Sequence, residues 1–220
     1  MPRWCAYLYL RFCVLSCFLL LGGCQSAYFS AMEKVGYHKR DILVSRVNDA
    51  RDEQERTAKQ IRSTLENFRT VVNFSGGDLE RQYSLLQLDL ERSEKRALAV
   101  RERITAVQEV ADALFVEWEA ELGHYSNPAL ASSSQAQLRE TRVRYERYLA
   151  AMLRAESRLE PVLRPFRDQV LFLKHNLNAR AVASLQSEVV AVQADVEVLI
   201  REMEHSMREA DQFLQGLQQY

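Results

Sequence analysis

Apolar and small residues recur at alternating steps of four and three along residues 79–122, and this period constrains the fold more than any other feature of the sequence. The positions are Leu79, Tyr83, Leu86, Leu90, Ser93, Ala97, Val100, Ile104, Val107, Ala111, Leu114 and Trp118. A sustained seven-residue repeat places these side chains on one face of a helix, and partner helices must cover that face. The pattern therefore predicts one long helix in a coiled-coil bundle.

Three further segments carry the same period, over about residues 40–72, 135–174 and 179–220. In the first of them the stripe consists of Leu43, Val47, Ala50, Gln54, Thr57, Ile61, Thr64, Phe68 and Val71. The connections between the segments are short, and short connections join antiparallel neighbours. The sequence therefore predicts an all-α fold over residues 40–220, an elongated antiparallel bundle of about four long helices with coiled-coil heptads.

Turn-forming residues separate the four segments. Asp78 follows an Asn-Phe-Ser-Gly-Gly run and is predicted to cap the second helix, and Asn178 is predicted to cap the fourth. Gly123 and Pro128 bound the middle turn, after which Ser132–Ser134 offer caps for the third helix. The helix ends are thus expected near residues 73–78, 123–134 and 175–178.

Pro161 and Pro165 fall inside the third predicted helix. Each proline removes a backbone donor and costs about 3 kcal/mol in an ordinary helix interior. Because the apolar stripe continues through both prolines in register, we predict a kinked but continuous helix. A kink also separates neighbouring side chains, so a pocket near it, lined by aromatic and apolar groups, is a second hypothesis. Its lining would be Tyr145, Tyr148, Met152 and Phe166.

The N-terminal segment ends in Leu21-Gly22-Gly23-Cys24 and has the layout of a lipoprotein signal. Arg3 and Arg11 precede an apolar run, and small residues precede the cysteine. This arrangement predicts a signal peptide over residues 1–23, cleavage after Gly23, lipidation of Cys24 and a lipidated tether over residues 24–39. The alternative is a retained membrane helix, in which Arg11 would lie near the middle of the bilayer at a cost of about 3 kcal/mol.

Cysteine usage agrees with this prediction, because Cys5, Cys13 and Cys17 would leave with the signal and only Cys24 would remain. Several acyl chains suffice for stable membrane anchoring, whereas one binds only marginally. Gln25 and Ser26 follow the cysteine, which resembles the sorting pattern of Gram-negative lipoproteins sent to the outer membrane. The expected location is therefore the outer membrane facing the periplasm, with the membrane as partner through the acyl anchor.

No motif in the sequence predicts a catalytic, cofactor or metal site. Two Glu-x-x-His pairs, Glu121–His124 and Glu202–His205, have the spacing used by di-metal bundles. They lie on helices expected to run in the same direction, yet at levels about 28 Å apart along the axis, which excludes a shared site. The charges are interspersed, at 27% charged residues and a formal net charge of −1, so no nucleic-acid partner is expected.

Three stretches of the sequence, YHKRDILVSRVNDARDEQ (37–54), FSGGDL (74–79) and FRDQVLFLKHNLNARAVASLQ (166–186), resemble a bacterial family catalogued as domain of unknown function 2959. The resemblance covers nearly the whole chain after the signal. It implies a helical, coiled-coil-rich periplasmic protein and supplies no activity, ligand or catalytic residue.

Two functional hypotheses of different class remain. The favoured one is a non-enzymatic envelope lipoprotein whose bundle serves as a scaffold, spacer or protein-docking surface. Its candidate partner-facing residues lie on the distal turns: Phe74, Asp78, Lys174 and Asn176. The alternative is a small-molecule-binding or enzymatic bundle with a pocket near Pro161 and Pro165. Self-association through spare apolar positions is a further option, involving Leu85, Val110 and Leu163.

Overall fold

The computed structural model describes residues 38–73, 76 and 78–218, and all regular structure in that part of the chain is helical. The predicted all-α class is confirmed. The helices are α3 (Lys39–Val72), α4 (Leu79–Leu122), α5 (Pro128–Ser157), α6 (Leu159–His175), α7 (Ala179–Ser184) and α8 (Gln186–Gln218).

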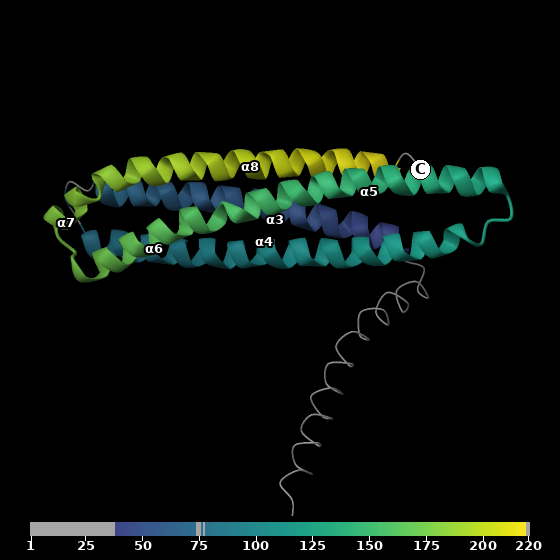
Figure 1. Cartoon of the computed structure of the whole chain (residues 1–220). Helices are drawn as coiled ribbons and strands as arrows, with labels where there is room; N and C mark the ends of the chain where they lie inside the picture. The colour runs from purple at the N-terminus through teal and green to yellow at the C-terminus, as the bar shows by residue number, and fades with distance from the viewer. Residues whose placement is uncertain (1–37, 74–75, 77, 219–220) are drawn as a thin grey trace, which may run out of the picture.

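The helices form an elongated antiparallel bundle (Figure 1). Helix α3 packs against α4 and α8, and α5 packs against the same two neighbours from the other side. Helix α6 continues the course of α5, and α7 precedes α8, so the six helices make four columns around one core.

The two ends of the bundle are built differently. Helix α3 begins and α8 ends at the end that carries the α4–α5 loop, and the α4–α5 hairpin extends beyond both of them (Figure 1). We call this the entry end, defined by the first turn of α3, residues 114–141 and the last turn of α8. The opposite end, which we call the turn end, comprises residues 66–73, 76 and 78 together with residues 166–188.

The predicted heptad stripes form the core. Every position of the α3 stripe is buried, including the polar Gln54, Thr57 and Thr64. In α4 the stripe is buried from Leu86 to Ala111, while positions nearer the two helix ends are half-buried against the core. The sequence period therefore identifies the buried face correctly along both helices.

A polar seam between α3 and α4 fixes their relative register. The Glu53 carboxylate accepts two hydrogen bonds from Arg96 Nη1, at 2.9 and 3.1 Å. About two turns nearer the start of α4, the Asp89 carboxylate accepts a hydrogen bond from Asn67 Nδ2. Between these two contacts, Thr64 Oγ1 lies 2.9 Å from Ser93 Oγ. Because buried carboxylates are costly unless they are partnered, a shifted register would leave these groups unsatisfied.

The prediction of one kinked, continuous third helix is wrong. The structure has two helices, α5 and α6, separated at Arg158. Pro161 has no N–H, so the carbonyl of Ser157 lacks its usual donor one turn later, and α5 ends there. Pro161 then occupies the first turn of α6, where no donor is needed, while Pro165 lies inside α6.

The starts of the third and fourth helical columns also differ from the prediction. Helix α5 begins at Pro128, capped by Asn127, whose side chain accepts from the N–H groups of Ala129 and Leu130. The expected caps at residues 132–134 are instead inside that helix, because Pro at the first helical position is itself a strong start signal. The fourth column begins at the predicted cap Asn178 but is interrupted at Leu185, between α7 and α8.

Candidate functional site

The predicted site residues are divided between described and undescribed parts of the chain. Gly23, Cys24 and Phe74 lie outside the described residues. At the turn end, Asp78 Oδ1 accepts from the N–H of Arg81 at 3.0 Å, which confirms its predicted role as a cap.

The other two predicted partner-facing residues lie close together in sequence at the end of α6. Asn176 Nδ2 donates to the carbonyl of Phe172 at 2.9 Å, and Lys174 is exposed. The side chain of Asn176 is thus engaged in local turn chemistry, as Asp78 is. Lys174 contributes an exposed charge beside the apolar side chains of Leu171 and Phe172, which are 60% and 40% exposed.

The pocket predicted near the two prolines is not formed by the side chains expected to line it. Tyr145, Tyr148, Met152 and Phe166 are at most 5% exposed. Tyr148 stacks on Phe213 with ring centroids 5.9 Å apart, and burial raises the pKa of both tyrosine hydroxyls. These four side chains are part of the buried core.

The two Glu-x-x-His pairs lie in different surroundings. On α8, Glu202 lies 3.8 Å from Arg154, and His205 Nε2 lies 3.1 Å from Arg154 Nη2. On α4, Glu121 is at the entry end, and His124 follows in the loop. Within the described residues no group of three or more metal-binding side chains gathers.

Of the described helices, none is both long and apolar enough to cross a membrane.

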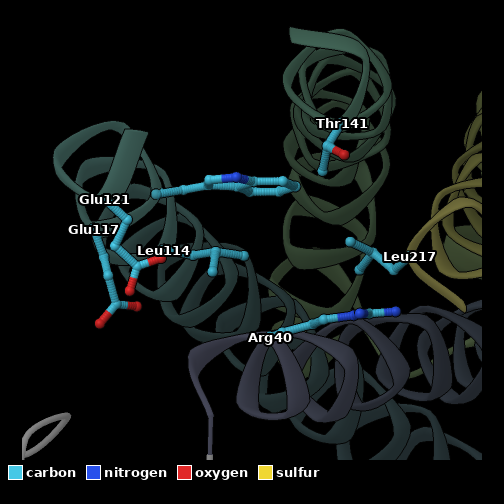
Figure 2. A pocket seen from close by; sticks show the side chains of 7 residues that line it. Arg40, Leu114, Glu117, Glu121, Thr141 and Leu217 are labelled. Atoms are coloured by element: carbon cyan, nitrogen blue, oxygen red, sulfur yellow. The ribbon is translucent and has the colours of Figure 1, made fainter. Parts of the chain in front are cut away.

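The entry end holds a cavity of about 200 Å³. It lies where the first turn of α3, the last turns of α4, the first half of α5 and the end of α8 meet. Figure 2 shows Leu114 and Leu217 facing each other across it, with Thr141 above Leu217 and Arg40 below. The complete lining is Arg40, Leu114, Glu117, Trp118, Glu121, Thr141 and Leu217.

Two charged side chains at the cavity have no partner among the described residues. Lys39 Nζ pairs with Glu117 Oε1 at 2.9 Å, so the charge of Glu117 is offset. Arg40 is half-buried, Glu121 is exposed, and neither makes a hydrogen bond or ion pair among the described residues. In Figure 2 the Arg40 side chain runs beneath Leu217, whereas Glu121 lies on the Leu114 side. One cation and one anion therefore border the same apolar space on opposite sides.

A groove between α3 and α8 provides a contrast. It is lined by several arginines, but Arg62 Nη2 pairs with Glu204 Oε1 at 3.1 Å, and Arg69 Nη1 pairs with Glu66 Oε1 at 2.6 Å. Arg62 and Arg69 are thus paired within the bundle, as is usual on helix surfaces, whereas Arg201, which also lines the groove, has no partner among the described residues. The entry-end cavity differs in that an unpartnered carboxylate, Glu121, borders it as well as an unpartnered arginine.

Trp118 ties the cavity to the α4–α5 hairpin. Its indole Nε1–H donates to Ser134 Oγ at 2.8 Å, which fixes the ring between α4 and α5. The indole N–H therefore has a hydrogen-bond partner, and the apolar part of the ring lines the cavity. A tryptophan is suited to such a position, where one side is apolar and the other is close to solvent.

From the sequence, Phe115, Trp118 and Tyr125 could line a pocket near this turn, but core packing is the favoured prediction for them; of the three, Trp118 lines the cavity. The charge pattern is a further signal for this end. Between Ile104 and Leu138 the chain has no lysine or arginine, while it carries Glu109, Asp112, Glu117, Glu119 and Glu121. This acidic stretch spans the end of α4 and the start of α5. The average composition conceals it, because the overall charge is close to zero.

The architecture is that of an elongated all-α coiled-coil bundle, and its first described helix, α3, begins at the entry end. A family model described as a protein of unknown function, DUF2959, matches residues 28–217. The match covers most of the chain, so the chain belongs to this family. No curated protein matches the sequence.

Proposed function

We propose that this protein is a lipid-anchored spacer of the bacterial envelope, held by acyl chains on Cys24 at the outer membrane and facing the periplasm. The bundle acts without catalysis, as a scaffold that carries a docking surface at the turn end. The observation that supports this most strongly is the geometry of α4. Its 44 residues separate the entry end from the turn end by about 65 Å.

The polarity of the chain supports an anchor at the entry end. The segment that precedes Lys39 joins the bundle there, and the proposed lipid site at Cys24 is 15 residues away in sequence. A tether of that length would keep the entry end within roughly 50 Å of the lipid even when fully extended. The turn end would then be the part of the protein farthest along the bundle from the anchor.

The turn end has features of a docking surface. Leu171, Phe172 and Leu177 are exposed there, close to the charged Lys174. Apolar side chains beside polar turn residues are typical of protein-binding surfaces. Asp78 and Asn176 make local hydrogen bonds that hold the turns in shape. We propose that these turns are the contact region for a protein partner.

In-cell photo-crosslinking tests the docking function. A photoreactive residue is placed at Asp78, Lys174 or Asn176, with the exposed mid-helix Lys95 as the control position. We expect a discrete crosslinked partner from the turn-end positions and background only from Lys95. If none of the three turn-end positions captures a protein above the Lys95 background, the docking function is wrong.

Metabolic acyl labelling with cell fractionation tests the anchor separately. Cys24→Ala is expected to abolish acyl labelling and to release the protein from the membrane fraction, because one residue carries the whole anchor. A Cys17→Ala variant serves as the control and is expected to remain labelled. A Cys24→Ala protein that stays membrane-bound without label would contradict the lipoprotein proposal.

A further inference from the structure

The entry-end cavity has a size that limits its occupant. Its volume of about 200 Å³ is below the range of about 300–1,000 Å³ typical of sites for drug-sized ligands. A lipid headgroup with the first part of its glycerol backbone, or a fragment of similar size, matches this space. The apolar walls formed by Leu114, Trp118 and Leu217 suit a molecule that is only partly polar.

The charges of the cavity further define the occupant. Arg40 offers a planar guanidinium, which binds phosphate oxygens through parallel hydrogen bonds. It also lies in the first turn of α3, where His38 provides no side-chain cap and helix N–H groups favour an anion. Thr141, which is 3% exposed and faces the cavity, adds a hydroxyl that can donate.

An anion alone does not fit the surroundings. Glu121 borders the cavity and has no partner among the described residues, whereas Glu117 is offset by Lys39. An occupant with net negative charge would therefore meet an uncompensated carboxylate at Glu121. A molecule that carries both a phosphate and an ammonium group satisfies Arg40 and Glu121 together.

We propose that the entry-end cavity binds the headgroup of a zwitterionic phospholipid with a primary ammonium group, of the phosphoethanolamine type. The phosphodiester pairs with Arg40, the ammonium group donates to the Glu121 carboxylate, and the glycerol region lies against Leu114, Trp118 and Leu217. This inference rests on the proposed function, because the acyl chains on Cys24 are what bring the entry end close to such lipids. The acyl chains would tether the bundle, and headgroup binding would fix its orientation relative to the membrane surface.

Tryptophan fluorescence gives a direct readout of this cavity. The chain contains two tryptophans, Trp4 and Trp118. A protein that begins at residue 24 with Cys24→Ser therefore has Trp118 as its sole tryptophan, retains every described residue and remains in solution without an anchor. Water-soluble dihexanoyl phosphatidylethanolamine and glycerophosphoethanolamine are the probes, and dihexanoyl phosphatidylglycerol is the anionic comparison.

We expect phosphatidylethanolamine to cause a saturable blue shift of Trp118 emission and to protect the ring from acrylamide. Glycerophosphoethanolamine should compete with it, and phosphatidylglycerol should bind about tenfold or more weakly, since one charge-assisted contact is lost and a repulsion is gained. Arg40→Gln should weaken phosphatidylethanolamine binding roughly tenfold or more. Glu121→Gln should reduce the preference for phosphatidylethanolamine over phosphatidylglycerol, an effect that a merely structural role would not produce.

Matched substitutions far from the cavity serve as controls. Arg180→Gln and Glu188→Gln change exposed residues at the turn end and should leave the binding curves unchanged. Circular dichroism establishes that each variant retains the helical fold. Thr141→Val gives a second cavity variant without a change of charge, with an expected weakening of a few-fold.

Three results would overturn the proposal: no saturable change in Trp118, equal binding of the two lipids, or an unchanged lipid preference in Glu121→Gln. Direct binding of glycerophosphoethanolamine without any binding of dihexanoyl phosphatidylethanolamine would exclude a membrane lipid as the source. Because the protein used here is unlipidated, these failures would leave the anchor at Cys24 untested. Conversely, loss of acyl labelling in the native protein would leave the binding curves as they are.

Discussion

The entry end and the turn end carry the same heptad pattern but use it differently. At the turn end Phe68 and Phe166 are fully buried and meet edge to face, with centroids 6.0 Å apart. At the entry end Leu114 and Trp118 hold equivalent stripe positions but are only half-buried beside a cavity. The α4–α5 hairpin extends beyond α3 and α8 there, so stripe positions close to the hairpin are covered only by the ends of those two helices (Figure 1). Helix stagger therefore separates a closely packed end from an end with a cavity.

The largest expected difference between the ends lies in core truncation. Phe166→Ala should lower the free energy of unfolding by about 3–5 kcal/mol, because it removes a buried ring and leaves a cavity. Leu114→Ala, at the entry end, should cost only about 1 kcal/mol, since its side chain is half-buried and solvent can fill the space. Urea denaturation measures both values, and equal losses would remove the distinction between the ends.

Helix caps should show the same contrast on a smaller scale. Asn178 accepts from the N–H of Ala181 at 3.0 Å, and Asn178→Ala should lower the global free energy of unfolding by about 1 kcal/mol. Asn127 caps the exposed start of α5, so Asn127→Ala should reduce hydrogen-exchange protection mainly in the first turn of that helix. The contrast fails if Asn127→Ala weakens protection throughout the bundle.

Surface ion pairs should matter least at both ends. Arg167 pairs with Glu160 and Glu94 at the α4–α6 contact, and Arg142 Nη1 pairs with Glu119 Oε1 at 2.8 Å near the entry end. Since these groups are solvent-screened, Arg167→Gln and Arg142→Gln should each cost less than about 1 kcal/mol in urea denaturation at neutral pH. A loss above this limit for either variant would show a role beyond the pair.

The Arg167 pair also predicts a weak pH dependence. The hydrogen bond from Arg167 lowers the pKa of Glu160. A carboxyl group whose pKa is lower in the folded state stabilises the fold above its unfolded pKa, and this contribution is lost as the pH falls through the folded value. Stability should therefore fall below about pH 4, and Arg167→Gln should make that fall slightly shallower. An identical acid limb in the variant would contradict the assignment.

The sequence predicted the parts of the fold that depend on local and periodic signals. The bounds of α3 and α4 and the caps Asp78 and Asn178 follow from the heptad period and turn chemistry. The break at Arg158 does not follow from the apolar stripe, which continues through it; it follows from the backbone donor that Pro161 lacks.

The entry-end cavity could not be predicted from the period alone. It depends on how far α4 and α5 extend past α3 and α8, a stagger that only the packed bundle reveals. Trp118 fits the stripe and is therefore expected in the core, whereas its position level with the first turn of α3 makes it part of the cavity wall. The aromatic residues near this turn and the acidic stretch at the end of α4 are the local signals for this end.

The central claim is that the entry end faces the membrane and the turn end stands away from it. Energy transfer from a single fluorophore to a headgroup acceptor in lipidated protein bound to vesicles tests this directly, with labels on His124→Cys or on Asn176→Cys; acylated Cys24 would not react. We expect strong transfer from position 124 and little from position 176, which lies about 65 Å further along the bundle. Equal transfer from both positions would mean that the bundle lies along the membrane, and would contradict the account.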